Sequence, residues 1–457
     1  MTSLTILGGG PAGLAVALYA QRSNIEFTLF ERSDELGGLC RTLRCGEHLY
    51  DSGAHRFHDR DPEITREVRS LLGGDLLSID APSKIWDSGR FVDFPPTPLN
   101  FLFSAGLSGA GRIGFELLAA RWRRRPFVTF ADFAVSQFGE TLARRFVLGY
   151  SEKVWGLPAD QLSPEAATSR LHGMTFVSLL LELMFPARKT PHIDGKFLYP
   201  RNGYGQICRK IVDSLPAQAL NTGCEVVGLE CEKSAIRRIH FAARAPLDPR
   251  GRVLSTLPLT QLVRLLGHAL PAPAREAAGR LRFRHIRLIF FRLARPRVSP
   301  NASIYIADPR ICISRLCEPK NRSSAMAPAE ETAMVAEVPC FADDPICRLS
   351  PEDLASRVEG ELAEAGLIRA SEIIEWKHHF LSNAYPVYSL DYAPLVRAIR
   401  DATARIANLD TLGRGGLFLY SHLHDQIRLG KDYVTALTSE AFRQQAKIDG
   451  DARPEPS

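Results

Sequence analysis

Cysteine pairs of the kind that hold metals or staple small secreted domains are missing from this sequence. The nine cysteines are odd in number and scattered, and no two of them stand in a C-x-x-C arrangement. The composition therefore excludes a zinc-ribbon or disulfide-framework protein, and we predict no metal. Free thiols in a reducing compartment are the simplest interpretation, which predicts a cytoplasmic protein.

Long apolar runs are missing too. A membrane-spanning helix needs roughly 18–20 predominantly apolar residues, and the most apolar later segment, 176–185, is interrupted by Glu182. The apolar N-terminus lacks a basic flank and is broken by glycines and a proline at 8–11, so it does not fit a secretory signal. Both observations agree with a cytoplasmic location.

A large excess of positive or negative charge is missing as well. The net charge is +6 over 457 residues, and no basic stretch carries interleaved aromatics, so we expect no nucleic-acid partner. One basic cluster, Arg121–Arg125, closes an apolar helical stretch. Such a cluster is usually a solvated helix end; the alternative is a weak contact with an anionic membrane surface.

What the sequence does have is a dinucleotide-binding motif at its start. Residues 8–13 read Gly-Gly-Gly-Pro-Ala-Gly, between a predicted strand ending at Leu7 and a predicted helix over 14–21. In this G-x-G-x-x-G pattern Gly8 permits the tight turn, Gly10 lets the backbone approach a pyrophosphate, and Gly13 lets helix and strand pack closely. The helix N-terminus supplies N–H groups for phosphates.

The following residues favour FAD. Glu31 ends the next predicted strand, over 27–30, where a carboxylate can accept hydrogen bonds from ribose hydroxyls. A second glycine pair, Gly37 and Gly38, and then Arg41 come shortly afterwards. These residues predict another backbone stretch beside the pyrophosphate, with Arg41 as a bidentate phosphate donor.

The remaining pattern alternates between helical and extended segments. Helices are predicted at 62–73, 351–366 and 431–446, with a mostly helical block from about 100 to 185. Strands are predicted at 223–256 and within 283–341, and residues 84–95 predict a hairpin that turns at Ser88–Gly89. Glycine-rich sequence returns near 413, which indicates a discontinuous first domain with other domains inserted.

Several segments carry a family resemblance: Glu31–Thr42, Tyr50–Phe57, Lys84–Pro95, Tyr150–Pro158, Phe197–Gly205, Ala384–Tyr388 and Gly413–Tyr420. Together they resemble the FAD-dependent amine oxidase and protoporphyrinogen oxidase superfamily, and within it most nearly the UDP-galactopyranose mutases and their bacterial relatives. The resemblance runs over most of residues 3–440.

The resemblance implies a mixed α/β (α+β) fold with three domains. A Rossmann-like FAD-binding domain of the GR2 type would comprise 1–80, 195–256 and 380–446. A mainly helical inserted domain would comprise 96–194, and an antiparallel-sheet substrate domain 81–95 and 257–379. The polar tail 447–457 is predicted to be disordered.

The resemblance also implies roles for individual residues. His55 would lie beside the isoalloxazine ring, while Arg170 and Arg315 would clamp the diphosphate of a nucleotide sugar. Further cofactor contacts would come from Gly413, Arg414 and Gly415, and further substrate contacts from Tyr305, Tyr385 and Tyr420. Arginine forks with tyrosine hydroxyls suit a diphosphate. The alternative for each arginine is a structural ion pair, and for each tyrosine a core aromatic.

The chain departs from the mutases at two places. Ala54 stands where they carry glycine beside the flavin, and its extra Cβ could restrict the backbone flip that accompanies flavin reduction. His424 stands where they favour asparagine, so it would contact a different substrate.

Two enzyme functions therefore stay open: a mutase-like enzyme that uses reduced flavin on a phosphate-bearing small molecule, with NAD(P)H as a possible reductant, and an oxidoreductase that removes hydride. A non-catalytic escort protein would have decayed cofactor motifs, and these are intact.

Overall fold

The computed structural model describes residues 3–87, 89–94, 116, 127–166 and 196–451. Two predicted features lie outside these residues: Arg170 and the basic cluster Arg121–Arg125. All nine cysteines are free thiols.

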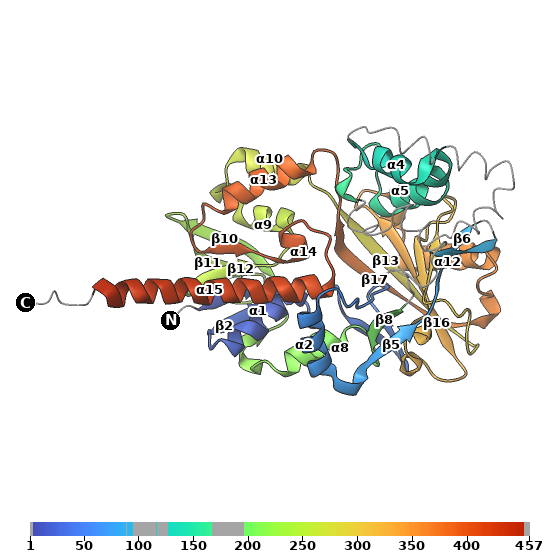
Figure 1. Cartoon of the computed structure of the whole chain (residues 1–457), viewed down its shortest axis with the longest axis horizontal. Coiled ribbons are helices and arrows are strands. Elements are labelled where there is room, and N and C mark those ends of the chain that lie inside the picture. The colour runs from blue at the N-terminus through green and yellow to red at the C-terminus, as the bar shows by residue number, and fades with distance from the viewer. Residues whose placement is uncertain (1–2, 88, 95–115, 117–126, 167–195, 452–457) are drawn as a thin grey trace, which may run out of the picture.

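A five-stranded parallel sheet forms one half of the molecule, on the left of Figure 1. Its strand order is β18-β12-β1-β2-β9, so segments far apart in the sequence become neighbours. The strands are β1 (Leu4–Leu7), β2 (Phe27–Phe30), β9 (Leu220–Asn221), β12 (Arg252–Ser255) and β18 (Leu409–Thr411).

Helices cover both faces of this sheet (Figure 1). Neighbouring residues of β1 point to opposite faces, and both are buried: Ile6 belongs to one apolar cluster and Leu7 to the other. The Ile6 cluster contains residues of α1 (Pro11–Arg22) and α15 (Leu423–Asp451). The Leu7 cluster contains residues of α9 (Leu259–Leu266), α10 (Ala272–Arg280) and α13 (Tyr392–Thr403).

A seven-stranded sheet forms the other half. Its order is β17-β13-β16-β15-β14-β6-β7, and every neighbouring pair is antiparallel except β14 and β6. The strands are β6 (Ser83–Asp87), β7 (Arg90–Phe94), β13 (Phe283–Leu293), β14 (Ser303–Ile306), β15 (Arg315–Cys317), β16 (Thr332–Cys340) and β17 (Ile373–Pro386). The hairpin predicted at 84–95 is β6 and β7. Helix α12 (Pro351–Glu364) packs against the sheet, where its apolar residues share a core with β13 and β16.

The described part of the helical block lies above the seven-stranded sheet (Figure 1). It comprises α4 (Phe130–Leu142), a π-helical stretch η2 (Ala143–Leu148) and α5 (Gly149–Trp155). Lys153 anchors α5 because its Nζ donates to three backbone carbonyls, those of Ile306, Asp308 and Ile313, at 2.9, 2.5 and 3.2 Å. Helix α5 is thereby fixed against the end of β14.

The remaining elements are shorter. The strands are β3 (Thr42–Cys45), β4 (His48–Asp51), β5 (Leu76–Asp80), β8 (Lys196–Pro200), β10 (Val226–Glu232) and β11 (Ala235–Phe241). The helices are α2 (Pro62–Leu72), α8 (Gln206–Asp213), α11 (Pro345–Arg348) and α14 (Gly413–Gly416). The 3-10 turns are η1 (Gly73–Asp75), η3 (Ala217–Ala219), η4 (Gly267–Ala269), η5 (Pro319–Asn321), η6 (Ser324–Met326) and η7 (Ala370–Glu372).

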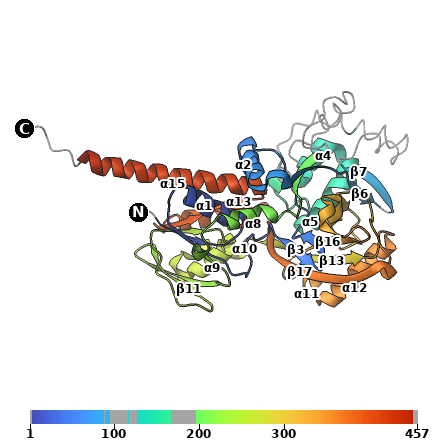
Figure 2. The same cartoon turned by 90° about the horizontal axis from the view of Figure 1, so that it is seen from below.

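The last helix is longer at both ends than the predicted 431–446. It begins at Leu423 and runs to Asp451, through the start of the tail that was predicted to be disordered, and extends beyond the parallel-sheet half (Figures 1 and 2). Gly430 lies inside this helix for a packing reason, since a Cβ there would come within 2.6 Å of the Ala15 Cβ on α1.

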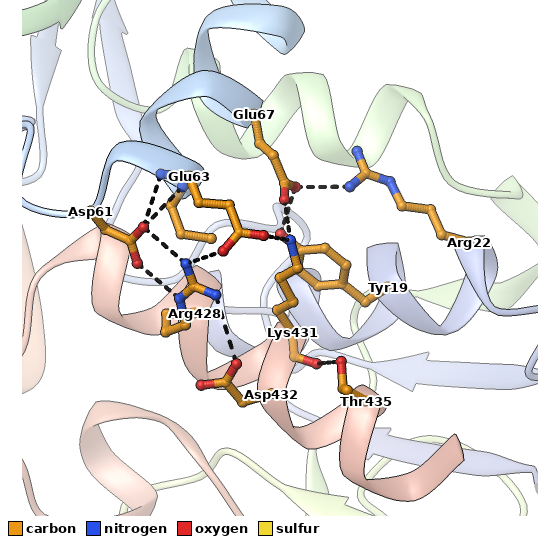
Figure 3. Close-up of polar contacts among 10 residues, drawn as sticks. Tyr19, Arg22, Asp61, Glu63, Glu67, Arg428, Lys431, Asp432 and Thr435 are labelled. Carbon is orange, nitrogen blue, oxygen red and sulfur yellow. Dashed lines mark hydrogen bonds and ion pairs between the residues drawn. The ribbon is translucent and has the colours of Figure 1, made fainter. Parts of the chain in front are cut away.

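An ion-pair network ties α15 to α2 and α1 (Figure 3). Arg428 binds Asp61 through two nitrogens, at 2.8 and 2.9 Å, and Glu63 at 2.6 Å. Lys431 bridges Glu63 and Glu67 at 2.5 and 2.7 Å, and Glu67 in turn accepts from Tyr19 on α1 at 2.6 Å and from Arg22 at 2.8 Å. Several charges in one network stabilise more than an isolated surface pair does.

The mixed α/β fold class is confirmed. Among the helices of the described residues, none combines the length and the apolar character needed to cross a bilayer.

Candidate active site

A cavity of about 590 Å³ is lined by residues of both halves. Its walls come from the glycine turn before α1, the loop over 52–60, helix α5, the seven-stranded sheet and the segment over 413–426. Most of the predicted site residues line it: Gly8, Gly10, Glu31, Gly38, Arg41, His55, Tyr305, Arg315, Tyr385, Gly413, Arg414, Gly415 and Tyr420. The structure therefore brings together residues that span the whole sequence.

The glycine turn forms a narrow cradle at one end of the cavity. Gly10 caps α1 without any side-chain hydrogen bond, so the first N–H groups of the helix stay available to an anion. Gly38 has a φ of +54° and crosses close to the turn, because a Cβ on it would lie 3.0 Å from the Gly10 Cα. Gly13 and Gly37 do not line the cavity, but a Cβ on Gly13 would lie 2.0 Å from the Gly8 oxygen. Gly13 thus permits helix and strand to pack.

Glu31 is held in place at the edge of this cradle. Its carboxylate accepts hydrogen bonds from the Gly9 N–H at 2.8 Å and the Ser33 N–H at 2.9 Å. A carboxylate has about four lone-pair sites, so these two bonds orient the group and leave room for further donors. Ribose hydroxyls are donors of the required kind.

Two arginines of the cavity have buried N–H groups without an acceptor among the described residues. They are the Nε of Arg41 and the Nε and Nη2 of Arg414. Arg414 Nη1 donates to the Ser421 carbonyl oxygen at 3.3 Å, and the guanidinium lies 4.9 Å from the ring centre of Tyr385 and 4.5 Å from that of Tyr420. Buried donors without partners are costly. The cradle, Glu31 and these donors therefore fit the phosphates, the ribose and the polar ring edge of FAD.

His55 is a neutral histidine in the wall of the cavity. Its Nε2 lies 2.9 Å from the Leu39 carbonyl oxygen, which can only accept, so Nε2 carries the proton. The ring stacks on Tyr204, with centroids 4.8 Å apart. Burial lowers the pKa of His55 to about 4, and the nearby positive charge of Arg315 adds to the effect. His55 therefore offers Nδ1 as an acceptor at neutral pH.

Arg315 forms a buried ion pair with Glu337. Its Nε and Nη2 donate to the two carboxylate oxygens of Glu337 at 2.9 and 2.7 Å, and the Ala54 N–H donates to the same carboxylate at 2.8 Å. Glu337 is only 3% exposed. Burial raises the pKa of Glu337, but the charge and hydrogen bonds of Arg315 outweigh it and hold that pKa below its usual value. Arg315 therefore makes the structural ion pair that was the alternative to a substrate contact.

Aromatic side chains form the wall next to Arg414. Tyr385 and Tyr420 are stacked, with centroids 5.8 Å apart and an interplanar angle of 16°. Trp155 meets both rings edge-on, at 6.3 and 6.1 Å, and stacks on Tyr388 at 5.7 Å. The Tyr388 hydroxyl accepts from the Tyr420 N–H at 2.6 Å. Trp155, Tyr388 and Glu337 were not predicted as site residues. The signal for Glu337 is a single charge inside an apolar strand.

His424 does not line the cavity. It is buried at the start of α15, edge-on to Phe57 at 6.2 Å and 3.2 Å from Asp425, whereas His422, just before the helix, does line the cavity. Arg170 lies outside the described residues. Among the residues that are described, no group of three or more histidines, cysteines and acids is arranged to hold a metal ion.

Comparisons with known proteins identify the family. The family model of flavin-containing amine oxidoreductases matches residues 11–420. Coproporphyrinogen III oxidase of Mycobacterium leprae is 30% identical over 159 residues, 32% of this chain and 35% of that protein. The Mycobacterium bovis enzyme is 26% identical over 297 residues, 61% of this chain and 63% of that protein. The chain thus matches less than two thirds of the length of these relatives.

Among solved structures, reduced UDP-galactopyranose mutase is 19% identical, with a TM-score of 0.82 over 96% of this chain and 94% of that one. This likeness shows the fold. The family match extends over most of the chain, and the cradle, Glu31 and the buried N–H groups fit the cofactor. The chain therefore belongs to the flavin-containing amine oxidoreductase family and is an FAD-dependent enzyme.

Proposed function

We propose that this enzyme removes hydride from a carbon atom of an organic substrate, as an oxidase or desaturase does, and that it does not rearrange a nucleotide sugar. The observation that carries the proposal is the Arg315–Glu337 pair. A diphosphate carries at least two negative charges and needs uncompensated arginine forks. The Nε and Nη2 atoms of Arg315, one of the guanidinium edges that could bind an anion at two points, already donate to Glu337.

Charge balance supports the same proposal. A buried carboxylate beside the predicted clamp would repel a diphosphate, and opening the pair would leave Glu337 buried and uncompensated. FAD, when bound, accepts the hydride. The protein supplies the surroundings: Tyr385 and Tyr420, packed against the buried Trp155, form an aromatic wall that suits a planar or conjugated substrate.

The named relatives support an oxidase. Both Mycobacterium proteins are named coproporphyrinogen III oxidases. We therefore propose a conjugated or readily conjugated ring compound as the substrate class. His55, neutral and with Nδ1 as an acceptor, is placed to hold a substrate or flavin N–H and not to carry a charge.

Anaerobic mixing of the oxidised holoprotein with candidate substrates tests the proposal. Coproporphyrinogen III, protoporphyrinogen and a primary amine would be added separately, and loss of the visible absorbance of the oxidised flavin would be followed. We expect at least one carbon–hydrogen donor to reduce the flavin, and air to restore the absorbance with formation of hydrogen peroxide. UDP-galactose serves as the matched negative control. Failure of every donor to reduce the flavin would contradict the proposal.

Mutase activity stays the second candidate because Tyr305, Tyr385, Tyr420 and Arg315 line one cavity, as the resemblance implies. Its substrate would bear a phosphate and its flavin would need a reductant such as NAD(P)H. The test is conversion of UDP-galactopyranose by dithionite-reduced protein, followed by chromatography. Conversion with reduced but not with oxidised flavin would establish this candidate and displace the first.

A further inference from the structure

Arg56 is a cavity-lining cation that neither the sequence motifs nor the cofactor fit accounts for. It follows His55 directly, and its side chain reaches the seven-stranded sheet, where Nη2 donates to the hydroxyls of Ser83 on β6 and Ser303 on β14. The guanidinium lies 4.8 Å from the ring centre of Phe197. Arg56 is therefore held by neutral groups at the sheet side of the cavity, away from the glycine cradle.

Its charge has no carboxylate partner within salt-bridge distance in the described part of the chain. Two other arginines buried at the same sheet differ, because Arg315 pairs with Glu337 and Arg284 pairs with Asp344 at 3.1 Å. Arg287 on β13 donates instead to the carbonyls of Ile346 and Leu349. A cation in a poorly hydrated wall is costly unless an anion accompanies it.

A second arginine makes the local charge more positive. Arg322, 2% exposed, donates to the same Ser303 hydroxyl at 3.2 Å and to the Ala302 carbonyl at 3.2 Å. Arg322 does not line the cavity. Arg56 alone presents this positive region to the cavity. Burial, together with the charges of Arg322 and Arg315, lowers the pKa of Arg56.

We propose that Arg56 binds an oxyanion of the substrate, a carboxylate or a phosphate, through the Nε and Nη1 donors that no described group occupies. Ser83 and Ser303 fix the orientation of the guanidinium, so little side-chain entropy remains to be lost on binding. This inference rests on the proposed function and narrows its substrate class to anionic ring compounds. The substrate's anion then lies at the sheet end of the cavity, with its ring against the aromatic wall.

The test uses two simple probes on the oxidised holoprotein. Benzoate stands for an aromatic carboxylate and UDP for a phosphate, and each is titrated while the flavin spectrum and the heat of binding are recorded. Replacing a charged hydrogen-bond donor at such a site is worth about 10- to 100-fold in affinity. We expect Arg56→Gln to weaken the binding probe by that factor.

Arg66→Gln is the matched control, because it removes the same charge from an exposed position on α2. Its affinity for the probe should equal that of the unaltered protein. Arg56→Lys keeps the charge without the planar donors, so it should bind with intermediate affinity and provides the test if Arg56→Gln does not fold. Binding of benzoate alone assigns a carboxylated substrate, and binding of UDP alone assigns a phosphorylated one.

Three results would overturn the inference: no binding of either probe, equal binding by the Gln variant, or loss of FAD from a folded Gln variant, which would move Arg56 to the cofactor. None of these readouts requires flavin reduction. Arg56-dependent benzoate binding in a protein that no donor reduces would leave this site intact while the oxidase proposal fails.

Discussion

The substitution Glu337→Gln tests the central ion pair of the cavity. Both carboxylate oxygens accept hydrogen bonds, one from Ala54 and Arg315 and the other from Arg315 alone. A glutamine keeps one oxygen, but its NH2 group must face an N–H donor that the second carboxylate oxygen accepted from in the original pair. The variant therefore places a donor against a donor and leaves the Arg315 charge buried and uncompensated.

Removing one partner of a buried pair costs about 3–5 kcal/mol. We expect the free energy of unfolding of the holoprotein, measured in urea, to fall by about that amount in Glu337→Gln. Glu331→Gln is the matched control. Glu331 precedes β16 and makes the same two-point ion pair with Arg292 on β13, at 2.6 and 2.9 Å, but its side chain is 24% exposed. That change should cost about 1 kcal/mol or less.

The dependence of stability on pH is a second test of the pair, and its direction can be predicted. Because the folded pKa of Glu337 lies below its usual value of 4.5, its contribution to stability is full above that pH and is lost as the pH falls through the folded pKa. The Gln variant should lack this acid-dependent loss. A Glu337→Gln protein no less stable than Glu331→Gln would refute a structural role for the pair and return Arg315 to the substrate.

The remaining predictions concern the cofactor and titrating groups. Glu31→Ala and Arg414→Ala should each purify with less FAD, and stoichiometric flavin in both would contradict the cofactor placement. Gly38→Val should also lose FAD, since its Cβ would lie 3.0 Å from a neighbouring backbone carbon; flavin content measures this. The hydrogen bonds of Asp61 to Arg428 on α15 lower the pKa of Asp61 to about 2. Asp61 should therefore stabilise the fold above pH 3.8 and lose this contribution as the pH falls toward 2. Acid unfolding of Asp61→Asn should lack this loss. His55 should titrate near 4 by nuclear magnetic resonance, and a midpoint near 6.5 would show that it is not buried.

The cofactor end of the site was predictable because its geometry is local. Gly8, Gly10 and Gly13 act within one turn, and Glu31 ends the adjacent parallel strand. Spacing along the chain therefore determines position in space. The second contact, at 413–415, came from the resemblance, and the structure brings it to the same cavity through β18.

The substrate end was less predictable because it depends on strand register. Arg315 and Glu337 are directly opposite each other on β15 and β16, and nothing in the spacing of 22 residues fixes that register. The difference between His422 and His424 depends on where α15 begins. A helix that starts at Leu423 turns His424 toward the core, and the sequence placed that start too late.

The Ala54 departure gains a physical meaning from these contacts. The sequence suggested that an extra Cβ would restrict the backbone beside the flavin. In the structure the Ala54 N–H is also bonded to Glu337, which Arg315 holds in place. A peptide flip at this position would break a hydrogen bond to a buried carboxylate, which costs more than a neutral bond does. The same carboxylate thus opposes the diphosphate binding that mutase chemistry requires, whereas hydride removal needs no bound diphosphate.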